Sequence, residues 1–177
     1  MNALNNTAIR YGLILAAVGI VTQLAIYAIN IELMANMSYG IVMLLITIAI
    51  VIYFAIQLRK IRGGFATFRE MFGDIFTMLI ISAVVGTIFN YVLFNFIDPK
   101  LSETLKEATI KNSEAMFAKL GMSGEQIDLA LAEIEKQDMS MTIGKSLQQL
   151  VIAGIMQSII GAILAAILKK NKPQEVF

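Results

Sequence analysis

The stretch "FNYVLFNFIDPKLSE", residues 89–103, decides the fold, because the chain changes character within it. Its first nine residues close a long apolar run, and Asp98-Pro99 opens a charged segment that extends to residue 146. Proline has no N–H to donate and crowds the preceding turn, so it ends a helix or takes the first position of a new one. Asp98 can cap that new helix with its carboxylate. The pair therefore predicts that a membrane helix ends here and that another helix begins outside the membrane.

Four segments of the chain contain the roughly 20 apolar residues that a helix needs to cross about 30 Å of hydrocarbon. Each is apolar around its whole circumference, and none has the alternating polarity of a barrel strand. The first span has about nineteen apolar residues, more than a signal peptide needs, so we expect an uncleaved anchor. The sequence predicts one all-α membrane domain over residues 1–177, with spans at about 9–29, 37–58, 75–97 and 147–168.

The composition agrees with a membrane protein and argues against most enzymes. Apolar residues make up 58% of the 177 residues, charged residues 15%, and the mean hydropathy is +0.74. The net charge of +1 gives no reason to expect a nucleic-acid partner. The chain has no cysteine and no histidine, so it lacks thiol chemistry, the commonest metal ligand and the usual proton shuttle. We expect no cofactor, no metal site and no catalytic residue.

The distribution of cations predicts the orientation. The connection 59–70 carries Arg59, Lys60, Arg62 and Arg69, and the tail carries Lys169, Lys170 and Lys172, whereas the 30–36 loop has no cation. The positive-inside rule then places both termini and the 59–70 connection in the cytoplasm. Residues 98–146, with nine acidic residues and six lysines, would face the other side of the membrane.

The inserted segment 98–146 has the pattern of two amphipathic helices that form a hairpin. Apolar residues recur at helical spacing in "KLSETLKEATIKNSEAMFAKL", and Ser123 with Gln126 forms a capping-box pattern before a second such run. Two helices of this length bury too little surface to be stable alone. Their apolar faces need the bilayer, the ends of the spans, self-association of the chain or a periplasmic protein partner, and the pattern leaves these alternatives open.

The connection between the second and third spans predicts a structural elbow. Gly63-Gly64 breaks the second helix, and Thr67 with Glu70 forms a capping box that begins the third. The four cations here could also bind a lipid or a partner. Because topology alone requires cations beside a span, the elbow is the preferred interpretation.

The polar and small residues inside the spans favour helix packing over a transport site. Small residues let helix backbones approach, and amides form hydrogen bonds across the contact. The predicted contact joins the third and fourth spans, with Ile160 and Leu164 facing lipid. Its residues are Ser82, Gly86 and Asn90 on the third span, and Gly154, Ser158, Ala162 and Ala166 on the fourth, with Gly161 beside them.

Four stretches carry a resemblance to a known family. They are "GGFATF", "FNYVLFNFIDP", "KLGMSGEQIDLALAEIEKQ" and a last span that ends in Lys-Lys. Together they resemble a domain-of-unknown-function family of small four-span membrane proteins common in Bacteroidetes, over nearly the whole chain. The resemblance implies this architecture and contributes no catalytic residue.

The sequence therefore favours a non-enzymatic membrane protein whose periplasmic hairpin serves interaction or stabilises an oligomer. The alternative is a small transporter or channel subunit that acts as an oligomer, since four helices alone hardly enclose a path. An enzyme would need Ser82 or Ser158 as its nucleophile, and neither has a base within helical reach.

Overall fold

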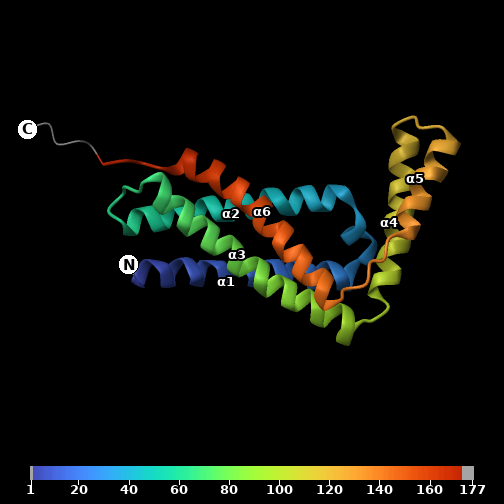
Figure 1. Ribbon diagram of the computed structural model, residues 1–177, viewed down its shortest axis with the longest axis horizontal. Coiled ribbons are helices and arrows are strands. Elements are labelled where there is room, and N and C mark those ends of the chain that lie inside the picture. The colour runs from blue at the N-terminus through green and yellow to red at the C-terminus, as the bar shows by residue number, and fades with distance from the viewer. Residues whose placement is uncertain (1, 173–177) are drawn as a thin grey trace, which may run out of the picture.

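The computed structural model describes residues 2–172, except the side chains of residues 2, 3 and 5. Residues 1 and 173–177 of the predicted domain lie outside this part. The described chain is all-helical (Figure 1), and its order is α1 (Asn2–Ile29), the 3-10 turn η1 (Ile31–Ala35), α2 (Met37–Ile61), α3 (Phe68–Val92), the π-helical turn η2 (Leu93–Ile97), α4 (Leu101–Lys119), α5 (Gly124–Lys136) and α6 (Ile143–Leu168).

Four of these helices are long and apolar enough to cross a membrane: Asn6–Ile29, Met37–Ile61, Phe68–Ile97 and Ile143–Leu168. This finding confirms the predicted all-helical chain with four candidate spans. The third candidate span begins at Phe68 rather than at residue 75, because Thr67 and Glu70 cap the helix before its most apolar part begins.

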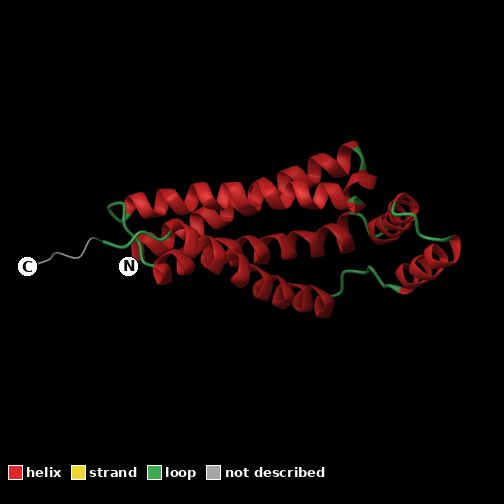
Figure 2. Ribbon diagram, turned by 90° about the horizontal axis from the view of Figure 1, so that it is seen from above, coloured by secondary structure: helices red, strands yellow, loops and turns green. Residues whose placement is uncertain are grey.

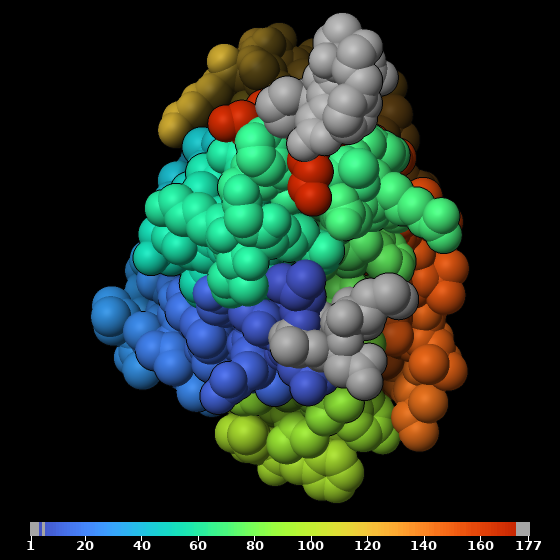
Figure 3. Space-filling model, turned by 90° about the vertical axis from the view of Figure 1, so that its left-hand side faces the viewer, coloured from blue at the N-terminus to red at the C-terminus, as the bar shows by residue number. Residues whose placement is uncertain are grey.

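Helix α3 is the centre of the bundle, and α1 and α6 pack most extensively against it. The beginning of α1 and the end of α6 lie at one end of the bundle, here called the termini end (Figures 1 and 3). Most of the largest fully buried side chains of the spans lie in the half of the bundle nearer this end: Val51 and Leu58 on α2, and Met71, Ile75 and Met78 on α3. Leu93 of η2, also fully buried, lies toward the opposite end. The first half of α2, by contrast, has no buried residue. The bundle is therefore tight at the termini end and looser toward the other.

Helix α1 lies against α3 at one especially close point. A β-carbon at Gly12 would lie 2.8 Å from the backbone oxygen of Met78 and 2.9 Å from Cβ of Ile81. Real β-carbons essentially never approach other atoms this closely, so only glycine fits here. The contact has the character of close helix packing in membranes, where small residues let backbones meet.

Helices α4 and α5 run across the other end of the bundle, here called the α4–α5 end, rather than along the spans (Figures 1 and 2). The short turn between them lets α5 run back beside α4. Helix α4 packs against both η1 and α5.

Candidate functional site

The turn between α2 and α3 depends on two glycines and a capping box. Gly63 and Gly64 have φ values of +81° and +88°, which residues with a β-carbon rarely adopt. The N–H of Thr67 donates to Glu70 Oε2 over 2.8 Å, and the N–H of Glu70 donates to Thr67 Oγ1 over 3.3 Å. The two bonds together satisfy donors that the start of a helix leaves free.

An ion pair connects the two helices across this turn. Arg62 Nη2 lies 2.8 Å from each oxygen of Asp74, and Nη1 lies 3.4 Å from Glu70 Oε1. Asp74 is only 4% exposed and belongs to the third candidate span. An ionised side chain at such a place is retained only when it is paired and hydrogen-bonded. The sequence alone indicates no partner for Asp74, and the structure supplies Arg62.

The end of α6 is attached to the same turn. Arg59 Nη1 donates to the backbone oxygen of Leu168 over 2.6 Å, which satisfies one of the free carbonyls at that helix end. Ala66 and Lys170 exchange two backbone hydrogen bonds of 2.9 and 2.8 Å. Lys170 also lies 5.4 Å from the centre of the Phe65 ring. Arg59 and Arg62 are thus committed to internal contacts, and this use favours an elbow that joins α2, α3 and α6.

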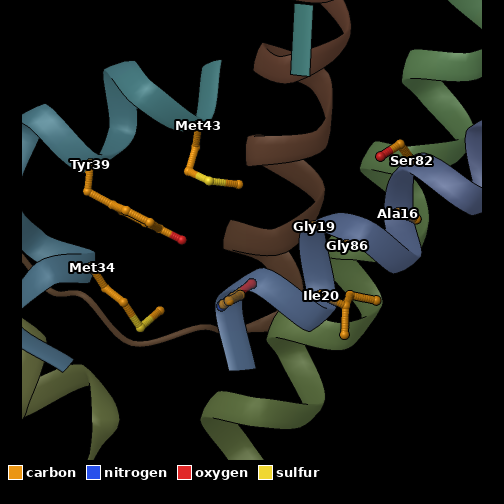
Figure 4. Close-up of a pocket in the computed structure, with 9 residues that line it drawn as sticks. Ala16, Gly19, Ile20, Met34, Tyr39, Met43, Ser82 and Gly86 are labelled. Atoms are coloured by element: carbon orange, nitrogen blue, oxygen red, sulfur yellow. The ribbon is translucent and has the colours of Figure 1, made fainter. Parts of the chain in front are cut away.

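A cavity of about 270 Å³ lies between α1, α2, η1 and α3 in the looser half of the bundle (Figure 4). Tyr39, Met43 and Met34 point across it toward Gly19 and Ile20 of α1. Its remaining lining residues are Ala16, Gln23, Ser82 and Gly86.

Three predicted packing residues lie near this cavity or within it. Ser82 and Gly86 face α1 and α2 across it, not the fourth span as the sequence predicts. Asn90 accepts a hydrogen bond of 2.7 Å from Gln23 Nε2 of α1. A side-chain amide pair of this kind satisfies polar groups that hydrocarbon cannot.

Helix α6 packs on α3 at Gly154, as predicted, but further along the helix the contact face is rotated from the predicted stripe toward Gly161. A β-carbon at Gly161 would lie 3.6 Å from Ile75, and one at Gly154 would lie 3.9 Å from Ile80. Ser158 Oγ donates to the Gly154 oxygen over 2.7 Å.

The exposure of other α6 residues shows in which direction the contact face is rotated about the helix axis. Ala162 is half-buried and Ala166 is exposed. The sequence predicts Leu164 and Ile160 on the lipid side, but Leu164 is 7% exposed and Ile160 is partly buried against the core, so neither of them faces lipid alone. The bulky Phe72 and Ile75 of α3 meet α6 at Gly161, and this contact turns Leu164 inward.

The exit from the third span is fixed to α1 and to the linker before α6. The Tyr27 hydroxyl donates to Asp98 Oδ2 over 3.0 Å. Asn95 Nδ2 donates to the oxygens of Tyr91 and Met141, each over 2.8 Å. These contacts hold the end of the third span in place, and the helix breaks at Asp98-Pro99, where the apolar run ends.

The predicted capping role of Asp98 is wrong in detail. Helix α4 begins at Leu101, and Lys100 at its cap position makes no side-chain cap bond. Asp98 Oδ1 instead accepts from the N–H of Lys100 over 3.2 Å, while its other oxygen binds Tyr27. Because its carboxylate is divided between these two donors, Asp98 forms a turn, and the new helix starts after it.

Helix α4 is anchored on the bundle. Leu101 is fully buried. Lys111 Nζ lies 3.1 Å from Glu32 Oε1, and Asn112 Nδ2 donates to the backbone oxygen of Glu32 over 3.2 Å. Both contacts join the middle of α4 to η1. The base and the middle of α4 thus have fixed positions over the ends of the spans.

Helix α5 packs against α4 and has a largely polar outer surface. Ser123 and Gln126 form the predicted capping box. Leu120 in the connecting turn and Leu129 on α5 are 70% and 66% exposed.

In the linker that follows α5, Asp138 pairs with Lys145 of α6. The Lys145 ammonium and the donors of Ser140 hold the pKa of the Asp138 carboxyl well below its usual range. The pair ties the linker to the first turn of α6.

The described residues give no support to a reactive centre. Within residues 2–172, no three acidic side chains gather closely enough to hold a metal ion. Ser158 is bonded to its own helix, and no carboxylate lines the cavity beside Ser82. Sequence reasoning missed Gly12, the Arg62–Asp74 pair and Tyr27. Of these, only the Arg62–Asp74 pair has a sequence signal: Glu70 and Asp74 are four residues apart and so lie on one face of α3.

Comparison with known proteins identifies a family. The sequence profile described as "Protein of unknown function (DUF4199)" matches residues 10–170. No curated protein and no solved structure matches the chain.

Proposed function

We propose that this chain, which belongs to the family of proteins of unknown function described above, is a non-enzymatic protein of the bacterial inner membrane. Its α4–α5 hairpin lies in the periplasm and binds another protein. Both termini and the α2–α3 elbow lie in the cytoplasm. A second copy of the chain is the first partner to test, and a periplasmic protein is the other.

The proposed orientation rests on exposed cations beside the ends of the spans. Lys60 and Arg69 are exposed at the termini end, together with Lys169, Lys170 and Lys172. The turn η1 at the opposite end has no cation of its own. Cations in a short connection or tail beside a span favour the cytoplasmic side. The six lysines of the long segment 98–146 count for less, because long segments obey the rule weakly.

One observation carries the proposed role: α4 is fixed across the bundle, while α5 uses that support to present an outer surface. Contacts of Leu101, Lys111 and Asn112 hold α4. Helix α5, whose described packing is mainly against α4, carries exposed Leu129 among exposed acidic residues. A rigid extramembrane helix with an accessible apolar side chain suits recognition of another protein, because little ordering is needed on binding.

Photo-crosslinking in native membranes tests this role. A photoreactive amino acid that replaces Leu129 is expected to give discrete adducts with protein. The matched control carries the same photoreactive amino acid in place of Arg69, which is exposed at the other end of the bundle. A discrete band from position 129 that is absent from position 69 supports the proposal. No protein adduct from either Leu129 or Leu120, in membranes where the chain is intact, would contradict it.

A second function is favoured by the cavity beside Gln23 and Asn90. Polar groups inside a bundle of spans can line a path for solutes, and an oligomer could complete such a path. The purified chain in liposomes would then conduct ions or small solutes, and Asn90→Leu would reduce the flux. Liposomes without flux above the protein-free control would remove this candidate.

A further inference from the structure

A second cleft lies between α3 and α6 at the α4–α5 end of the bundle. Its volume is about 340 Å³, within the range of roughly 300–1,000 Å³ that small-molecule sites occupy. No charged residue lines it, and its walls are almost wholly apolar. The lining residues are Val84, Thr87, Ile88, Tyr91, Ile143, Ser146, Leu147 and Leu150. An occupant must therefore be apolar over most of its surface.

One polar group in the wall of this cleft has no partner within the described chain. Ser146 is 7% exposed, and its Oγ makes no hydrogen bond to any described residue. A serine in a helix commonly satisfies its hydroxyl on the carbonyl four residues earlier. The Ser158 hydroxyl donates such a hydrogen bond to the Gly154 oxygen, but the Ser146 hydroxyl makes no such bond to the Thr142 oxygen. A buried hydroxyl without a bond is costly, so its partner is expected to come from outside the chain.

The depth of Ser146 indicates what that partner is. Helix α6 has 26 residues, or about 39 Å at 1.5 Å per residue, against about 30 Å of hydrocarbon. The excess leaves roughly 4–5 Å of helix beyond the hydrocarbon at each end. Ser146 is three residues after Ile143, so it lies at this boundary, where the ester groups of membrane lipids are found. The apolar part of the cleft extends from there toward the middle of the span.

We propose that this cleft binds an ester-linked phospholipid of the surrounding bilayer. One acyl chain lies against Val84, Ile88 and Leu150, and the Ser146 hydroxyl donates to an ester carbonyl. An acyl chain is slender and flexible, so it can lie in an apolar cleft of this volume. The inference is independent of the role proposed for α4–α5, and it holds for either orientation of the chain.

Native mass spectrometry of the full chain in mild detergent tests the proposal. The probes are phosphatidylethanolamines with the same chains, joined by ester bonds in one and by ether bonds in the other. Because an ether lacks the carbonyl, wild-type protein should retain the ester lipid about three- to tenfold better, the range expected for one hydrogen bond.

Three variants separate the hydroxyl from the cleft. Ser146→Ala should bind both lipids equally, since it removes only the donor. Leu150→Trp should lose both lipids, because its ring fills the cleft. The matched control is Ser158→Ala, whose hydroxyl is bonded within α6, and it should keep the wild-type preference. Equal retention of ester and ether lipids by the wild type, or the same loss in Ser158→Ala as in Ser146→Ala, would overturn the proposal.

Discussion

Replacing Gly12 by alanine tests the closest contact between α1 and α3. The new β-carbon would lie 2.8 Å from the Met78 oxygen and 2.9 Å from Ile81 Cβ, so one helix must move. The Met78 oxygen is backbone, and it cannot turn away as the end of a flexible side chain could. The cost of such overpacking is about 1–3 kcal/mol.

Gly19→Ala is the matched control on the same helix. A β-carbon at Gly19 would have no neighbour within 4 Å, so this variant keeps only the gain of about 0.5–1 kcal/mol that alanine brings to a helix. Both variants share that gain, and the difference between them isolates the steric cost of about 1–3 kcal/mol.

Thermal unfolding in detergent at one scan rate is the assay. For a chain of this length each kcal/mol corresponds to about 2–4 °C, so Gly12→Ala should have a Tm about 2–12 °C below that of Gly19→Ala. Size-exclusion chromatography checks that both variants are folded before heating. Equal Tm values, or a higher Tm for Gly12→Ala, would refute the close approach of α1 to α3.

Two further predictions concern ionised groups. Arg62→Gln leaves the buried Asp74 carboxylate without its partner and should cost about 3–5 kcal/mol of stability, whereas Arg69→Gln, an exposed arginine beside the same turn, should change stability by less than about 0.5 kcal/mol. Adding Asp74→Asn to Arg62→Gln should recover part of the loss in a double-mutant cycle, and additive effects would contradict the pairing. Asp138→Asn should lower Tm slightly at neutral pH, because the pKa of Asp138 is lower in the folded chain than its unfolded value of about 3.9. The stabilisation from Asp138 is present above its unfolded pKa and is lost as pH falls through its folded pKa. The Tm difference between wild type and Asp138→Asn should therefore shrink on acidification, and a difference that grows would contradict the prediction.

The spans and the two inserted helices could be predicted because each depends on local composition. Four long apolar runs require helices in lipid, since an unpaired backbone is too costly there. The Ser123–Gln126 capping box is local as well, because it involves residues three positions apart. Such features need no knowledge of which helices meet.

The contacts between elements could not be predicted in the same way. Gly12 stands in an apolar run like any other small residue, and only its position against Met78 makes it necessary. Tyr27 and Asp98 are 71 residues apart, and nothing in either neighbourhood indicates the other. The sequence does not distinguish the contact face of α6, because small residues form two adjacent stripes on this helix and only the bulk of Phe72 and Ile75 selects between them. The hydroxyl of Ser146 gives no sequence signal at all, because its meaning depends on its burial in the wall of the cleft between α3 and α6.

The proposed topology places α4 on the side of the membrane opposite the termini. The chain has no cysteine, so single cysteines can be introduced at exposed positions without background. Glu114→Cys on α4 and Lys60→Cys at the end of α2 are the matched pair, both exposed. In intact spheroplasts an impermeant maleimide should label Cys at position 114 and should label position 60 only after the membrane is broken. Labelling of position 60 but not of position 114, or of both in intact cells, would contradict the account.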